Sequence, residues 1–169
     1  MSVDTANINL LGEDQLATQF IFSLVSIPGG GNTDAVSMRM NYDFDPPEES
    51  VGTYDIMFRG VKLTKTNMTE GTTKEFTIEV RIDQKWQVYK DLHAWKNLVY
   101  DPGNGTAQSE AATRTTATVQ ALNNTGDVMY TFTFLDSKIK SIKAGTFSNS
   151  SEDPLTTTLT FVYRKMEVD

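Results

Sequence analysis

Few side chains in this chain are suited to acid–base or nucleophilic chemistry. There is a single histidine, His93, and no cysteine. His93 can be considered as a general base or a metal ligand, but no second histidine or thiol exists to share a metal ion, and no local Ser/His/Asp signature accompanies it. A polar residue at the margin of a helix face is the interpretation we favour. We therefore expect no enzyme activity, no catalytic residue, no metal site and no cofactor.

A second group of chemically interesting side chains is an acidic cluster around two prolines. Asp43, Asp45, Glu48 and Glu49 stand in the segment DFDPPEES. Carboxylates can hold calcium, but this segment lacks the alternating ligand spacing and central glycine of an EF-hand loop. The pattern favours a solvated loop over a metal site.

The third group is a short row of lysines, Lys138, Lys140 and Lys143, in SKIKSIK. Nucleic-acid binding is a weak interpretation of this row, because no aromatic residue interleaves with it and the formal net charge of the chain is −7. Lysines that protect an edge strand against unwanted pairing fit the pattern better.

The clearest structural pattern is a strand that leads into a helix. Apolar residues alternate with polar ones from Phe76 to Ile82, which is the period of a half-buried strand. Asp83 can then cap a helix of about residues 85–100, which ends before Asp101-Pro102-Gly103. The residues assigned to pack this helix against a sheet are Trp86, Leu92, Trp95 and Val99.

The rest of the 169-residue chain reads as strands and loops. The predicted strands cover residues 18–26, 35–43, 54–58, 61–63, 115–121, 128–134, 139–144 and 156–164. The Asp43–Ser50 and 101–113 segments are expected to be loops, and Arg59-Gly60 a tight turn. The fold predicted is mainly β: an antiparallel sandwich or barrel with one α-helix over one end. Residues 1–169 are expected to form one domain, with residues 1–15 as a flexible N-terminal arm.

The N-terminus carries acids and lacks an apolar run, so it does not resemble a secretory signal, and no segment has the length of a membrane span. The expected location is the cytoplasm or, for a viral protein, a virion assembled there. No membrane insertion is expected.

Taken in order, these pieces resemble the tail tube proteins of contractile-tailed bacteriophages and related contractile injection systems. The resemblance rests on TKEFTIEVRIDQKWQVYKDLHAWKNLVYDPGNGTAQSE, from Thr73 to Glu110. In that family a strand leads into a single helix with a tryptophan near its end, followed by a loop of glycine and small polar residues. The strands 128–134 and 156–163 match the family in order and spacing, so the resemblance covers roughly residues 15–165.

The resemblance implies a structural subunit that forms six-membered rings, stacked into a hollow conduit. The strands of each subunit would join a ring-wide β-barrel, and tail sheath, baseplate and tape-measure proteins would be its partners in the virion tail. DNA would pass through without sticking, kept off by acids on polar strand faces, for which the candidates are Asp43, Asp55, Glu75 and Glu79. The loop expected to contact the neighbouring ring consists of Asp45, Pro46, Pro47, Glu48 and Glu49. The lysine row would meet acids on the next subunit.

Two other functions remain open from the sequence. One is the tube protein of a bacterial secretion or contractile injection system, which carries protein instead of DNA. The other is a monomeric β-sandwich that binds a small ligand or glycan. That module requires a concave aromatic patch, whereas the aromatic residues here mostly alternate onto core faces.

Overall fold

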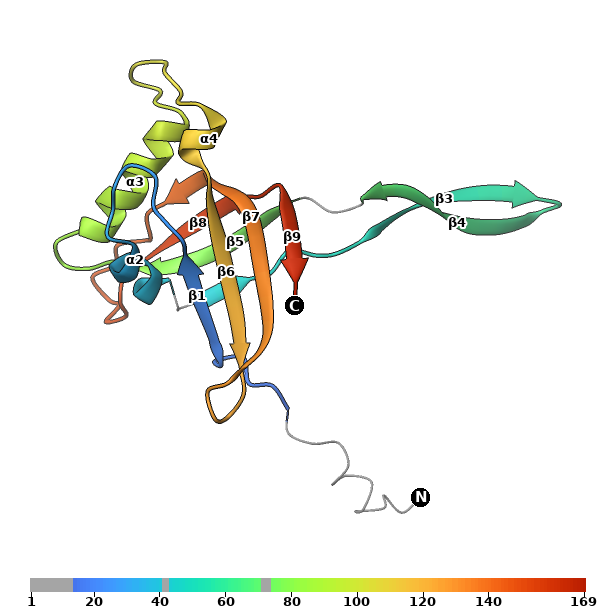
Figure 1. Ribbon diagram of the computed structural model, residues 1–169, viewed down its shortest axis with the longest axis horizontal. Coiled ribbons are helices and arrows are strands. Elements are labelled where there is room, and N and C mark those ends of the chain that lie inside the picture. Colours follow the sequence, from blue (N-terminus) through green and yellow to red (C-terminus); the bar gives the residue numbers. More distant parts are fainter. Residues whose placement is uncertain (1–13, 41–42, 71–73) are drawn as a thin grey trace, which may run out of the picture.

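The computed structural model describes residues 14–40, 43–70 and 74–169. The N-terminal arm predicted for residues 1–15 thus lies almost entirely outside the described residues. Figure 1 shows a body of strands and helices from which one hairpin projects. None of the described helices is long and apolar enough to cross a membrane. In chain order the elements are β1 (Phe20–Leu24), α2 (Thr33–Arg39), β2 (Asp43–Asp45), β3 (Val51–Phe58), β4 (Val61–Glu70), β5 (Glu75–Arg81), α3 (Gln87–Val99), α4 (Glu110–Thr113), β6 (Thr115–Leu122), β7 (Val128–Lys143), β8 (Thr156–Val162) and β9 (Lys165–Val168).

The sheet of the body is organised around the long strand β7. The strand order is β1-β6-β7-β8-β5-β2, with β9 also paired to β7, and every pairing is antiparallel. The first half of β7 pairs with β6 and β9, whereas residues 138–143 pair with β8. We call β1, β6, the first half of β7 and β9 the first half-sheet. The second half-sheet consists of β2, β5, β8 and residues 138–143 of β7.

The sequence pattern predicts two separate strands at 128–134 and 139–144, but the structure has one continuous strand. No glycine or proline interrupts residues 135–138. Asp136 instead bends the strand locally by adopting a left-handed conformation with φ of 54°. One chain segment therefore serves both half-sheets.

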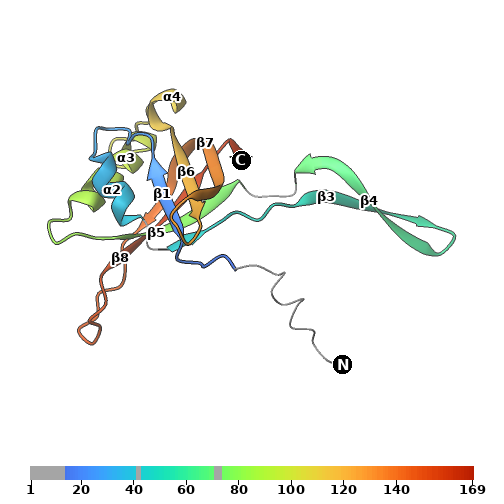
Figure 2. The same ribbon diagram turned by 60° about the horizontal axis from the view of Figure 1, so that its bottom comes forward.

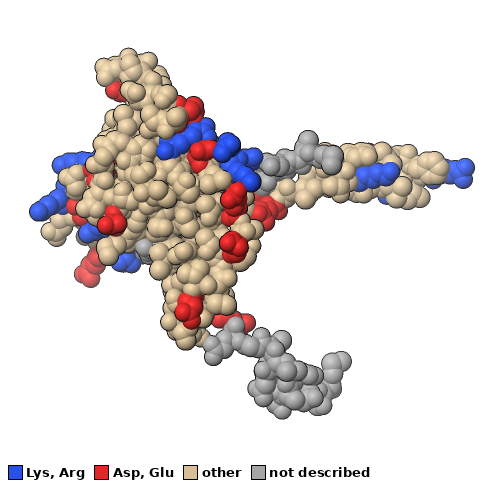
Figure 3. All heavy atoms as spheres, in the orientation of Figure 1, with Lys and Arg blue, Asp and Glu red and all other residues tan. Residues whose placement is uncertain are grey.

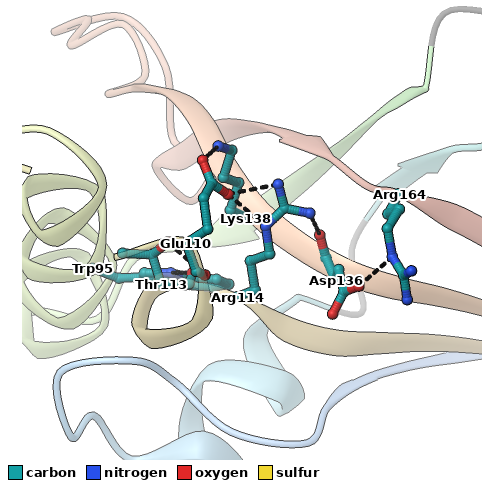
Figure 4. Close-up of polar contacts among 7 residues, drawn as sticks. All are labelled: Trp95, Glu110, Thr113, Arg114, Asp136, Lys138 and Arg164. Carbon is teal, nitrogen blue, oxygen red and sulfur yellow. Dashed lines mark hydrogen bonds and ion pairs between the residues drawn. The ribbon is translucent and has the colours of Figure 1, made fainter. Parts of the chain in front are cut away.

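Polar contacts surround this bend (Figure 4). Arg114 donates to the carbonyl of Asp136 at 3.3 Å, and the Asp136 carboxylate forms an ion pair with Arg164. Glu110 on α4 accepts from Lys138 at 2.7 Å and from Arg114 at 2.6 Å, and these two cations lower the pKa of Glu110. Such exposed ion pairs contribute little to stability but favour one orientation of α4 and the bend.

The predicted strand and helix at the centre of the chain are confirmed. The carboxylate of Asp83 accepts from the backbone N–H groups of Gln87 and Val88, both at 3.2 Å, which is the predicted capping role. Burial raises the pKa of Asp83, but hydrogen bonds from the backbone N–H groups of Val88, Gln87 and Asp83 itself, together with the charge of Arg39, outweigh burial and lower the pKa. The helix begins at Gln87 because Trp86 is held in a left-handed conformation.

The four residues predicted to pack the helix against the sheet differ in how deeply they are buried. Leu92 and Trp95 are fully buried, and Val99 packs partly buried against the same core. The indole N–H of Trp95 donates to the buried carbonyl of Thr113 at 2.7 Å. Trp86 is only half-buried and stacks on Phe147, with ring centroids 6.0 Å apart, so its assignment to the core side of the helix is wrong. A leucine or tryptophan on the i, i+3, i+7 stripe reaches the core, whereas Trp86 precedes the helix.

The strand predicted at 35–43 is also wrong, because residues 33–39 form the helix α2. Its Asn32 cap accepts from the backbone N–H of Ala35 at 3.1 Å. Val36 and Met40 are buried four residues apart, whereas Met38 between them is 78% exposed. Alternation and a helical stripe share the positions i and i+4, so this short pattern fitted both periods. The described chain therefore has three helices, α4 lying in the predicted loop 101–113, instead of one.

The predicted turn at Arg59-Gly60 is confirmed, with φ of 49° and 79°. It joins β3 and β4, which are longer than the pattern indicated and form a sheet of their own. Figures 1 and 2 both show this hairpin extending away from the body, and we call it the projecting hairpin.

We expect Trp95→Phe to lower the free energy of unfolding by about 2–4 kcal/mol, because it leaves a void and an unpaired buried carbonyl at Thr113. Trp86→Phe, at the half-buried tryptophan, is the matched control and should cost about 1 kcal/mol or less. Urea denaturation followed by circular dichroism measures both. Equal losses in the two variants would contradict the assigned core.

Candidate interaction surfaces

The only histidine lies on an exposed face of α3. Its ring stacks on Tyr89 at a centroid distance of 6.0 Å, and its Nδ1 is 3.3 Å from the side-chain amide of Asn97. His93 lies in a shallow hollow with Tyr89, Lys90, Ala94 and Asn97, and no described serine or threonine lines this hollow. Within the described residues, no three His, Asp or Glu side chains converge in a way that can hold a metal ion. The exposed surfaces of the described chain are the other candidates for function.

The structure divides the predicted inter-ring loop into parts. Asp45 ends β2, and Pro46, Pro47, Glu48 and Glu49 connect it to the projecting hairpin. Pro46 lines an apolar cleft of about 570 Å³ between β1 and β2. Glu48 and Glu49 border a second hollow, of about 310 Å³, beside Lys165. The loop is thus the root of the hairpin, and whether it contacts another ring remains a prediction.

Three of the four candidate lumen acids lie in the second half-sheet. Asp43 on β2 and Glu79 on β5 are directly opposite each other. Glu75 on β5 forms an ion pair with Lys140 on β7. Their facing inward in a tube remains a prediction.

The fourth candidate, Asp55, lies apart from the others on the projecting hairpin. There it accepts from Lys62 and from the Thr64 hydroxyl, both at 2.7 Å. These two contacts lower the pKa of Asp55. Asp55 therefore belongs to a different surface from the other three acids.

The projecting hairpin is a surface that sequence reasoning missed. β3 and β4 pair with each other, and neither makes an extensive contact with another described element. Met57, Phe58 and Val61 near the turn are 70%, 61% and 59% exposed, and Tyr54 and Leu63 are also exposed. Alternation in this segment indicates a strand with one apolar face, but it does not show that no third layer covers that face.

Basic side chains accompany the exposed apolar ones. Between residues 51 and 67 the hairpin carries Arg59, Lys62 and Lys65 against the single acid Asp55. The guanidinium of Arg59 lies 5.3 Å from the centre of the Phe58 ring. Figure 3 shows basic side chains on the hairpin, whereas acidic and basic side chains both lie over the visible face of the body. A contiguous, exposed apolar and basic ribbon on an otherwise acidic protein is typical of a protein-binding surface.

No protein-family model and no curated protein sequence matches this chain. Its fold, however, is similar to that of several solved chains. A chain in the cryo-EM structure of the sheath/tube terminator of an extracellular contractile injection system, PVC, aligns with a TM-score of 0.67 and 13% identity, over 94% of this chain and 99% of that one. A chain of the PVC sheath–tube complex aligns with a TM-score of 0.60 and 15% identity, over 99% of both chains.

A chain in the baseplate of the anti-feeding prophage, AFP, aligns with a TM-score of 0.64 and 13% identity, over 94% of this chain and 97% of that one. The likeness thus covers nearly the whole chain. It confirms the mainly β, antiparallel fold class and, at the level of the fold, the resemblance to proteins of contractile tails.

We expect Phe58→Ser on the projecting hairpin to change the free energy of unfolding of the isolated chain by no more than about 0.5 kcal/mol, because the ring packs on nothing in the body. Phe134→Ala in the core is the comparison and should cost about 3–5 kcal/mol. Denaturant melts at low protein concentration measure both. A large loss from Phe58→Ser would show that the hairpin folds back on its own body.

Proposed function

We propose that this chain is a self-assembling subunit of the hollow tube of a contractile injection machine, with a mechanical and not a catalytic role. The observation that carries the proposal is the projecting hairpin, whose apolar side chains are exposed although the body has a complete core. The fold shared with chains of an extracellular contractile injection system and of the anti-feeding prophage baseplate supports it.

The hairpin fits assembly because its contact with a second copy is heterologous. It extends from the body on one side, so a surface that receives it on a neighbouring copy leaves that copy's own hairpin free (Figure 2). Repetition of such a contact yields an open stack without further components. Burial of Met57, Phe58 and Val61 supplies the hydrophobic driving force.

The predicted inter-ring loop supports the same contact from the hairpin's root. Pro46 and Pro47 restrict the backbone where the chain leaves β2, and this lowers the conformational entropy lost when the hairpin docks. We infer that the loop and the hairpin together link one ring to the next. Six-membered rings and a ring-wide barrel belong to this proposal.

The cargo is DNA in a phage tail or protein in an injection or secretion system. Acids on the second half-sheet suit DNA, because a negative lumen does not bind phosphates. The similar chains come from an extracellular contractile injection system and from the baseplate of the anti-feeding prophage, and this likeness supports an injection system that carries protein as the second candidate. Sheath and baseplate proteins are the proposed partners in both cases, with a tape-measure protein and virion location in the phage.

The assembly role is tested with Phe58→Asp. The wild-type protein should sediment as species much larger than its 18.8 kDa chain as concentration rises, whereas Phe58→Asp should remove stacked species, because a charge cannot enter an apolar contact. Thr53→Asp, exposed on β3 further from the turn, is the control and should assemble more readily than Phe58→Asp. Sedimentation velocity distinguishes them. A variant that stacks as the wild type does would contradict the proposed role of the hairpin.

The cargo role is tested with Glu79→Lys. At protein concentrations high enough for this variant to assemble, its tubes should retain fluorescent DNA, which wild-type tubes release, because a ring of lysines replaces a ring of carboxylates. Asp153→Lys, on an exposed loop, is the control. Retention of DNA should fall steeply as salt is raised. Equal DNA release by wild-type and Glu79→Lys tubes would place Glu79 outside the lumen.

A further inference from the structure

The second half-sheet has two open edges of opposite charge. β2 at one edge pairs only with β5, and residues 138–143 of β7 at the other edge pair only with β8, among the described strands. We infer that the ring closes when β2 of one copy pairs with this part of β7 in the next copy, which brings Asp43 of one copy beside Lys143 of the other. This inference rests on the proposed tube function and specifies its ring contact.

Strand direction permits this closure. β2 is antiparallel to β5, β5 to β8, and β8 to β7. The two edge strands of this four-stranded unit therefore run in opposite directions. Copies related by rotation about one axis then join through β2 and β7 as an antiparallel pair. The strand direction therefore alternates without interruption around the whole barrel.

The registers place opposite charges at the two ends of one row of side chains. Asp43 lies opposite Glu79, Glu79 opposite Thr158, and Thr158 opposite Lys143. The adjacent core-facing row consists of Phe44, Ile78, Leu159 and Ile142. The charged row thus lies on the face away from the core, where a closed barrel has its lumen.

Among the residues that the structure describes, the charges at the ends of this row have no ion-pair partner. Asp43 and Glu79 are neighbouring carboxylates, and neither has a cation at ion-pair distance in the described part of the chain. Like charges directly opposite each other on two strands are unfavourable. Lys143 likewise has no anion there, whereas Lys138 and Lys140 pair with Glu110 and Glu75. In the ring that we infer, the Lys143 ammonium of the next copy lies beside the carboxylates of Asp43 and Glu79 and offsets their negative charge.

The first half-sheet offers the competing closure, since β1 and β9 are also edge strands with no second partner among the described strands. Its charges are already matched, because Lys165 and Glu167 on β9 form an ion pair with each other at 2.8 Å. The facing edge strand β1 has the sequence FIFSL, without a charged residue. This pair of edges has no electrostatic complementarity to specify a partner.

The absence of cysteine from the chain permits a direct test by disulfide formation. The double variant Asp43→Cys/Lys143→Cys, oxidised while assembled, should give a ladder of covalent oligomers that ends at the closed ring. Neighbouring strands of a barrel are often staggered along their length, so β2 could pair with β7 one row away from Lys143. The double variant Asp43→Cys/Ser141→Cys tests that register. Each single-cysteine variant should give no ladder, because the two edges differ. The matched control Ile21→Cys/Glu167→Cys bridges β1 and β9 and should also give none.

Exchanging the two charges tests the proposed attraction between Asp43 of one copy and Lys143 of the next. Asp43→Lys and Lys143→Asp should each raise the concentration needed for ring formation about tenfold, and the double exchange should restore it. Melting curves at low concentration verify that every variant folds. Rings that cross-link only through β1 and β9 would overturn the inference and leave the tube function intact. Absence of any assembly in the unmodified protein would overturn the tube function itself.

Discussion

The architecture depends on one strand that takes part in two half-sheets. β7 runs from Val128 to Lys143 and bends at Asp136, where its partners change from β6 on one side and β9 on the other to β8. Because the two half-sheets share this strand, their apolar faces turn toward a common core that includes Phe22, Phe76, Phe134 and Phe161. Trp95 on α3 packs against Phe161 in that core, and its indole N–H ties α3 to α4.

The same arrangement leaves both half-sheets with edge strands that have no second partner among the described strands. An unpaired edge is a hazard in a monomer, and natural proteins either protect it or use it for association. Here β2 and the end of β7 carry opposite charges in matching rows, and the projecting hairpin exposes an apolar surface. The two features differ in direction: edge pairing joins copies side by side, whereas the hairpin extends beyond the body. Under the proposed function, edge pairing would close the ring and the hairpin would link one ring to the next.

The sequence predicts the local units of this fold well. The alternating strand β5, the Asp83 cap, the buried Leu92 and Trp95 and the turn at Arg59-Gly60 all follow from short-range patterns, and the structure confirms them. The wrong predictions have two causes. Some patterns are too short to distinguish a strand from a helix, as at Val36 and Met40, and the position of an element relative to the rest of the fold leaves no local pattern. Nothing local shows that the hairpin at Phe58 has no third layer.

The candidate site illustrates the same limit. The acids and the lysine row can be recognised as groups in the sequence, but their relative positions in the sheet cannot. Only the pairings from Asp43 through Glu79 and Thr158 to Lys143 show that they end one row at opposite edges of a four-stranded unit. Registers between strands distant in the chain depend on the whole fold and cannot be read from composition or spacing.

Electron microscopy of the purified, untagged protein over a range of concentrations tests the central claim most directly. Hollow rings that stack into tubes as the concentration rises, with a lumen formed by the strands of all subunits, are the expected result. Uniform monomers at the highest concentration, with or without isolated tube ends added as nuclei, would contradict it.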